Sequence, residues 1–109
     1  MASEDLSRIH NNFVKIFNNF FDLAFKDGRL NTSHISVYMA LLETWNLNKC
    51  KDPILIKRDK IMAIAKIKSI ATYHKCIKEL NNWNYINYRP QHNPAHNSYV
   101  YFSDGISPT

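Results

Sequence analysis

The spacing of the apolar residues changes once along this chain, close to Asn84, and that change constrains the fold more than any other feature. Before this point the apolar residues recur at intervals of three and four, which is the period of an amphipathic helix. Beyond it, residues 85–88 and 98–102 are rich in aromatic and β-branched side chains, which favour strands. Pro90 and Pro94 lie between these segments and favour a turn. The sequence therefore predicts a mainly α protein with a small β-hairpin.

Four helices are predicted before the hairpin, over residues 5–26, from 32 or 33 to 46, 58–65, and from 69 to 82. Thr32 or Ser33 is expected to cap the second helix, and Ser69 the fourth. The first helix is expected to end at Gly28 in the left-handed conformation that glycine adopts at helix ends. Residues 54–56 are expected to form a short extended segment, and Asn84 is expected to take a positive φ.

The length and composition indicate one folded domain. The chain has 109 residues, of which 45% are apolar, and contains two glycines and four prolines. That is too apolar for a disordered chain and too short for several domains. We predict an N-terminal helix over residues 1–30, a compact domain over 31–102 and a flexible tail over 103–109.

The positive charge is confined to one part of the chain. Residues 1–53 carry six basic and six acidic residues, whereas residues 54–109 carry eight basic and three acidic ones, so the second half holds the whole net charge of +5. All eight basic residues of that half fall between Lys57 and Arg89. A basic segment of this kind favours an anionic partner, and nucleic acid in particular.

The predicted order of elements is that of a winged helix-turn-helix preceded by an extra amphipathic N-terminal helix. In that arrangement the second helix of the pair enters the major groove of duplex DNA, while the flanking basic residues and the hairpin contact the backbone. The outer face of the helix after Ser69 is small at its start and basic beyond, as groove entry requires. The candidate DNA-binding residues are Lys57, Arg58, Lys66, Lys68, Ser69, Ala71, Thr72, His74, Lys75, Lys78, Arg89, His92 and Asn93.

Several stretches of the sequence also resemble one family. They are residues 31–38 with Trp45-Asn46, residues 58–62, residues 67–80, and the hairpin residues 85–90 with His92-Asn93-Pro94. Together they resemble small winged-helix transcriptional regulators of Bacteroidetes-type bacteria and, more distantly, the DNA-binding domains of plasmid and phage replication initiators. In that family the hairpin tip tends to carry Gly-Ser near the position of Asn97-Ser98, so this chain departs from the family pattern there. The resemblance implies sequence-specific DNA binding through residues 69–78 and the hairpin, often on mobile elements.

No catalytic, cofactor or metal site is expected. The chain lacks a glycine-rich phosphate loop, a nucleophile elbow and a pair of catalytic carboxylates. His92 and His96 have a metal-like spacing, but no cysteine or carboxylate stands beside them in the sequence. We expect Tyr73 to lie in the core rather than act as a nucleophile, and His34 to cap a helix. The chain is expected to have no enzymatic activity.

The expected location is the cytoplasm, with no membrane partner. The first residues are acidic and lack the apolar region of a secretory signal. No apolar run approaches the roughly 20 residues that span a bilayer. Cys50 and Cys76 are isolated from one another in the sequence, so both are expected to be reduced.

The first helix leaves a second interpretation open. Besides its main apolar stripe it carries Val14, Phe21 and Phe25, which is more apolar surface than one core needs. Either the domain encloses this helix, or the helix contacts a second copy to form a homodimer. An alternative function follows from the second case: a protein-interaction module that uses a winged-helix scaffold in a replication or transcription complex.

Overall fold

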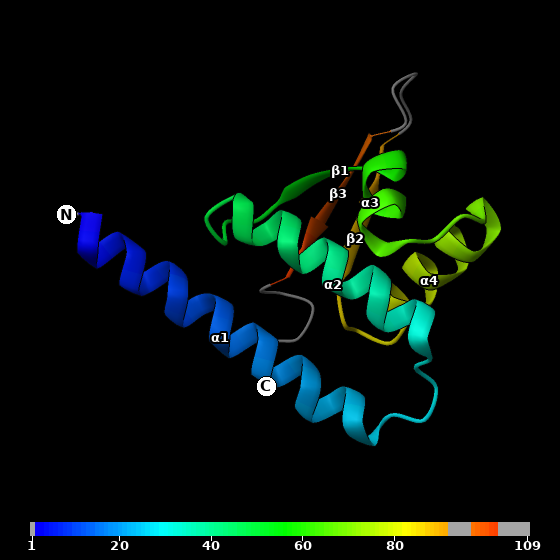
Figure 1. The fold of residues 1–109 in the computed structure, drawn as a ribbon, viewed down its shortest axis with the longest axis horizontal. Coiled ribbons are helices and arrows are strands. Elements are labelled where there is room, and N and C mark those ends of the chain that lie inside the picture. The colour runs from blue at the N-terminus through cyan, green and yellow to red at the C-terminus, as the bar shows by residue number, and fades with distance from the viewer. Residues whose placement is uncertain (1, 92–96, 103–109) are drawn as a thin grey trace.

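A computed structural model describes residues 2–91 and 97–102 (Figure 1). Four helices and three short strands follow one another along the chain, which confirms the prediction of a mainly α protein with a small β component. The elements are α1 (Ala2–Lys26), α2 (Thr32–Leu47), β1 (Ile54–Lys57), α3 (Arg58–Ala65), α4 (Ile70–Asn82), β2 (Asn87–Pro90) and β3 (Asn97–Tyr101).

The three strands form one antiparallel sheet in the order β1-β3-β2. The register pairs Ile54 of β1 with Val100 of β3, and Asn87 of β2 with Tyr101 of β3. The extended segment predicted over residues 54–56 is therefore β1, which pairs with the hairpin strand β3. The sequence did not predict this pairing. In this strand Ile54 and Ile56 are buried, while Leu55 and Lys57 are exposed.

The first strand of the hairpin begins two residues later than predicted. Tyr85 and Ile86 have a strand-like composition, but both are buried and both direct their N–H groups to the carbonyl of Leu80 at the end of α4. Tyr85 and Ile86 therefore pack in the core and bond to the end of α4, and the strand β2 begins at Asn87. Asn84 has a φ of 66°, as predicted, and this left-handed residue turns the chain from the helix toward the sheet.

Two helix ends differ from their predicted form. Asn31, rather than Thr32 or Ser33, caps α2: its side chain accepts from the N–H groups of Ser33 and His34, and His34 Nδ1 accepts from the N–H of Asn31. His34 thus completes a reciprocal capping pair, in the position that Glu or Gln usually takes. The expected capping role of His34 is confirmed.

The end of α1 does not use a left-handed glycine, because Gly28 has a negative φ. Asp27 organises this turn instead. Its carboxylate accepts from the backbone N–H of Arg29 at 3.0 Å and from the Arg29 guanidinium at 2.8 Å, and it also accepts from the hydroxyl of Tyr85 at 2.7 Å. These bonds hold the pKa of Asp27 well below its usual range, and the bond to Tyr85 fixes the end of α1 to the segment between α4 and β2.

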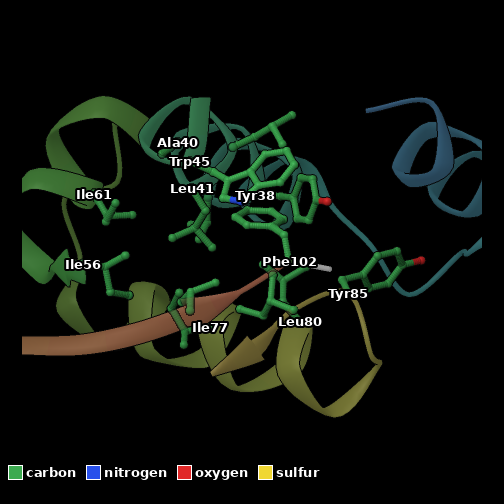
Figure 2. Packing of buried hydrophobic residues seen from close by; sticks show 14 of the residues in the cluster. Tyr38, Ala40, Leu41, Trp45, Ile56, Ile61, Ile77, Leu80, Tyr85 and Phe102 are labelled. Atoms are coloured by element: carbon green, nitrogen blue, oxygen red, sulfur yellow. The ribbon is translucent and has the colours of Figure 1, made fainter. Parts of the chain in front are cut away.

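The core lies between α2, α3, α4 and the sheet (Figure 2). Its largest fully buried side chains include Trp45 and Tyr38 of α2 and Phe102 after β3. Phe102 packs against both rings, with centroid distances of 5.1 Å to Trp45 and 5.4 Å to Tyr38. In α3 the buried residues are Ile61 and Ala65, whereas Ile64 is exposed.

One face of α1 closes the core, and the other face is exposed. Phe20 is fully buried and stacks on Tyr38 with a centroid distance of 3.8 Å and nearly parallel rings. Phe21 is 43% exposed and Phe25 is 92% exposed, so within the described chain the domain does not enclose this helix. Figure 1 shows the N-terminal half of α1 extending away from the other helices.

The hydroxyl of Tyr38 makes no hydrogen bond to any described residue, although Tyr38 is fully buried and burial raises its pKa. A buried unpaired hydroxyl costs about 1–3 kcal/mol. Replacing Tyr38 with Phe keeps the ring stack, so the free energy of unfolding should stay the same or rise. Tyr85→Phe is the matched control, because it removes a bonded hydroxyl and should lower stability. Urea unfolding of both variants measures the difference, and a clear loss in Tyr38→Phe would contradict this expectation.

Candidate nucleic-acid interface

Helices α3 and α4 are joined by the tight turn of residues 66–69. Lys66 ends α3 in the left-handed conformation, with φ 62° and ψ 33°, and its N–H donates to the carbonyl of Met62. The hydroxyl of Ser36 on α2 donates to the carbonyl of Ala65, which attaches this turn to the core. Ser69 caps α4 as predicted, since its hydroxyl accepts from the N–H of Thr72 at 3.1 Å. The turn is therefore fixed at both helix ends.

The residues of α4 divide between a buried and an exposed face. Tyr73, Cys76, Ile77 and Leu80 are buried, as predicted, and Trp83 beyond them is partly buried. Since residues three and four apart share a helix face, the exposed residues lie together on the opposite side. These are Ala71, His74, Lys75 and Lys78, while Thr72 at the edge is partly exposed. The structure thus brings five of the predicted site residues onto one helix surface.

The flanking basic residues lie around this helix pair. Lys57, at the end of β1, is exposed, as are Lys66 and Lys68 in the turn. Arg58 begins α3 and is partly exposed; its Nε lies 3.4 Å from the carboxylate of Asp59. These residues place positive charge at both ends of α3: Lys57 and Arg58 at its start, and Lys66 and Lys68 in the turn that follows it.

Arg89 lies on β2, an edge strand of the sheet, and is exposed. Its Nε donates to the side chain of Asn87 at 2.9 Å, and its guanidinium lies 5.8 Å from the ring centroid of Tyr101. Both contacts orient the side chain while leaving it accessible. His92 and Asn93 lie outside the described residues, as does His96.

A cleft of about 180 Å³ lies between α4 and the sheet. His74 lines it from α4, Arg58 from the start of α3, and Gln91 from the end of the hairpin strand. On its floor the hydroxyl of Tyr88 lies 3.1 Å from the hydroxyl of Ser98, across the β2–β3 pair. The cleft joins two predicted site residues, Arg58 and His74, with polar groups that the sequence did not single out.

The sheet and the acidic residue of α4 are both held in place by specific bonds. Asn81 of α4 accepts from the N–H of Tyr88 at 2.9 Å, which ties β2 to the helix. Glu79 lies 2.8 Å from His34 Nε2, and His34 is buried. Because His34 Nδ1 already accepts from Asn31, Nε2 carries the proton and donates to Glu79. This bond engages the single carboxylate of α4 with His34 of α2.

The groups that suggested other chemistry have structural roles. Tyr73 is buried, as predicted, and burial raises its pKa to about 12, so it stays protonated at neutral pH. Cys50 and Cys76 are free and buried, and burial raises the pKa of each thiol. Among residues 2–91 and 97–102, no group of three or more His, Cys, Asp or Glu side chains is arranged to hold a metal ion. None of the helices described is long and apolar enough to span a membrane.

Sequence reasoning missed Gln91, Tyr88 and Ser98, which line the cleft, and the pairing of His34 with Glu79. These groups come together across as many as 45 residues of chain, and no local pattern signals such a contact. Comparison of the chain with family models, with curated proteins and with solved structures found no match.

Proposed function

We propose that this protein binds double-stranded DNA, with α3 and α4 as a helix-turn-helix and the β2–β3 hairpin as its wing. The exposed face of α4 carries the proposal: it is small near Ala71 and basic at Lys75 and Lys78, while its opposite face is buried in the core. A helix that enters the major groove needs one face packed against the core and an outer face with small side chains near its start and basic side chains beyond.

In the proposed complex the start of α4 meets the base edges. Ala71 and the methyl group of Thr72 suit apolar contact with a thymine methyl. His74 and Lys75 follow on the same face and can donate to base acceptors or to phosphates. The backbone N–H of Thr72 donates to the capping hydroxyl of Ser69. The side chain of Thr72, and not its N–H, is therefore the group that can contact DNA.

The remaining basic residues set the position of the protein on the duplex. Lys57, Lys66, Lys68 and Arg89 are exposed around α4, as phosphate contacts require. Arg58 and His74 also line the cleft next to Gln91, so a phosphate beside α4 would meet donors from both helices and the hairpin. His92 and Asn93 belong to the proposal from the sequence alone.

The salt dependence of binding tests this proposal. If each protomer engages about five phosphates, the logarithm of the association constant should fall against the logarithm of salt concentration with a slope of about −4 to −5 per protomer. Fluorescence anisotropy with labelled genomic fragments selected by binding would measure the slope between low and physiological salt. A flat response would contradict a phosphate-based interface.

We also propose that the protein acts as a homodimer through α1. Val14, Phe21 and Phe25 are exposed, and their spacing places them on one side of the helix. Phe21 packs on Phe17 with a centroid distance of 4.9 Å, which widens this aromatic surface. Burying such a surface against a second copy removes apolar area from water.

Light scattering at tens of micromolar protein should therefore give the mass of a dimer. Phe21→Asp with Phe25→Asp should give the mass of a monomer, because each charged side chain would be forced into the apolar contact. Leu47→Asp is the matched control, since Leu47 is 74% exposed at the end of α2. A monomeric mass for the unmodified protein would contradict the dimer.

The biological role that fits these proposals is that of a cytoplasmic transcriptional regulator or an initiator-type factor of a mobile element. The exposed aromatic face of α1 also favours a second candidate, a protein-interaction module in a replication or transcription complex. The two candidates differ in their dependence on α4. Loss of function on charge reversal of Lys75 and Lys78 supports DNA binding, whereas loss only on substitution of Phe21 and Phe25 supports the interaction module.

A further inference from the structure

The cleft beside α4 holds a pair of hydroxyl groups that the DNA contacts proposed above do not use. Tyr88 of β2 pairs with Val100 of β3, and Ser98 of β3 pairs with Pro90 of β2, so Tyr88 and Ser98 are diagonal neighbours in the sheet. Their hydroxyl oxygens are 3.1 Å apart. Ser98 is only 8% exposed, and a buried hydroxyl needs hydrogen-bond partners. The Tyr88–Ser98 hydroxyl pair is therefore a polar spot on the floor of the cleft.

This hydroxyl pair has one more proton than its own hydrogen bond uses. Each hydroxyl carries one donor proton, and its oxygen can also accept. Only one of the two protons can lie between the oxygens of Tyr88 and Ser98. The other proton can therefore be donated to an acceptor that enters the cleft, and the donor carries no charge.

The walls next to the hydroxyl pair are apolar. Ile56 and Tyr73 are both buried, and they line the cleft together with Pro90. Proline has no N–H, so Pro90 contributes no backbone donor of its own. Hydrogen bonds are stronger where apolar groups keep water away. A bond from the hydroxyl pair to a ligand is therefore stronger than the same bond at an open surface.

The other polar side chains of the cleft are also donors. Arg58, His74 and Gln91 line it, and each has a nitrogen that can donate. Arg58 is the first residue of α3, where the helix dipole is positive. Its Nε lies 3.4 Å from the carboxylate of Asp59, whose side chain is 88% exposed, so this ion pair is weak. Residues 92–96, which follow Gln91, include no acidic residue.

The size of the cleft restricts its ligand to a small group. Its volume is about 180 Å³, below the roughly 300–1,000 Å³ of sites for organic molecules. A phosphate group is small, and its oxygens can accept from several donors at once. We propose that the cleft holds one backbone phosphate of the bound duplex, with the Tyr88–Ser98 hydroxyl pair and Arg58 as its donors. This site presupposes the DNA binding proposed above and adds a contact that fixes the position of α4 on the duplex.

Salt distinguishes the two kinds of donor. A cation that binds a phosphate releases counterions, whereas a neutral hydroxyl does not. Tyr88→Phe keeps the ring, which packs against the core, and removes only the hydroxyl. We expect Tyr88→Phe to bind a duplex selected from genomic fragments about tenfold more weakly, with an unchanged salt slope. Arg58→Gln should instead reduce the slope by about 1 per protomer, as fluorescence anisotropy would measure.

Replacing each backbone phosphate of that duplex in turn by a methylphosphonate identifies the contact, because it removes one charge and one acceptor oxygen at a single position. At one position per protomer, the loss of affinity should be smaller in Tyr88→Phe than in the unmodified protein by about threefold or more. At the other positions the two proteins should show equal losses. Tyr101→Phe is the matched control: Tyr101 is partly exposed on the sheet face opposite Ser98, and this variant should behave as the unmodified protein does.

Two failures are distinguishable. If the unmodified protein does not bind duplex DNA, or its affinity does not depend on salt, the proposed function is wrong. If it binds DNA with the expected slope, but folded Tyr88→Phe keeps full affinity or shows the same losses at every phosphate, the DNA proposal stands and the phosphate site is refuted. If Tyr88→Phe does not fold, as judged by circular dichroism, Ser98→Ala replaces it, and equal losses at every phosphate in that variant refute the site.

Free phosphate has the same chemistry as a backbone phosphate, so its binding needs a separate measurement. Inorganic phosphate is titrated into the full-length protein at constant ionic strength, and the amide chemical shifts of Tyr88 and Ser98 are followed. A backbone site should not saturate below about 10 mM, because the free ion lacks the other contacts that the duplex makes. Saturation at much lower concentrations, with shifts centred on these two residues, would assign the cleft to a free anion and overturn the proposal.

Discussion

Charge reversal of Lys75 and Lys78 is expected to abolish binding to duplex DNA while leaving the fold intact. Both lysines are exposed on the outer face of α4, opposite the buried residues, and glutamate favours helices about as well as lysine does. The variant removes two phosphate or base contacts and places two negative charges against the DNA backbone. We expect the affinity to fall by about 100-fold or more at physiological salt, and the salt slope to shrink by about 2 per protomer.

The control for this experiment is Lys15→Glu with Lys26→Glu. It changes the net charge by the same amount at two exposed positions of α1, outside the proposed interface. If the lysines of α4 contact DNA directly, the control should retain nearly all of the affinity. Equal losses in the two variants would show that net charge, and not the face of α4, governs binding. Circular dichroism and the thermal midpoint of each variant establish that the fold is retained.

Phe20→Ala is expected to cause the largest loss of stability among the substitutions considered in α1. Phe20 is fully buried, stacks on Tyr38 at 3.8 Å and meets the edge of Tyr85 at 5.6 Å. Truncation leaves a cavity at the point where α1 joins the rest of the domain. Such phenylalanine truncations cost about 3–5 kcal/mol. Chemical unfolding followed by fluorescence or circular dichroism would measure the change in the free energy of unfolding.

Phe25→Ala is the matched control, because it makes the same truncation five residues further along α1. Phe25 is 92% exposed, so its removal should change the free energy of unfolding by less than about 0.5 kcal/mol. The measurement belongs at low protein concentration, where association through the exposed face of α1 contributes little. Similar losses from both variants would mean that α1 is not attached to the domain through Phe20.

The sequence predicted the helices well because the signals that define them are local. The apolar spacing identified all four, and the hydroxyl of Ser69 marks the start of α4 in the structure as it does in the sequence. The positive φ of Asn84 was predicted for the same reason. The errors also have local causes: Asn31 competes with its neighbours Thr32 and Ser33 for the cap, and all three are residue types that cap helices.

The candidate site was predictable only in part. The exposed face of α4 follows from helix periodicity, so the sequence alone groups Ala71, His74, Lys75 and Lys78 on one surface. The cleft that joins Arg58 to His74 and Gln91 could not, because it depends on how β2 packs beside α4. The hydrogen bond between Asp27 and Tyr85 could not be predicted either, because the two residues are 58 positions apart in the chain.

By itself, the sequence determined that this chain is mainly helical with a small sheet, and that its basic residues gather in the second half. Apolar period, capping residues and charge are properties of neighbouring residues, so they can be read without a fold. Only the tertiary structure decided that β1 pairs with β3, that His34 binds Glu79, and that Phe20 is buried while Phe25 is exposed. The physical reason is that burial and pairing depend on contacts between distant segments, which form when the helices and the sheet pack around one core.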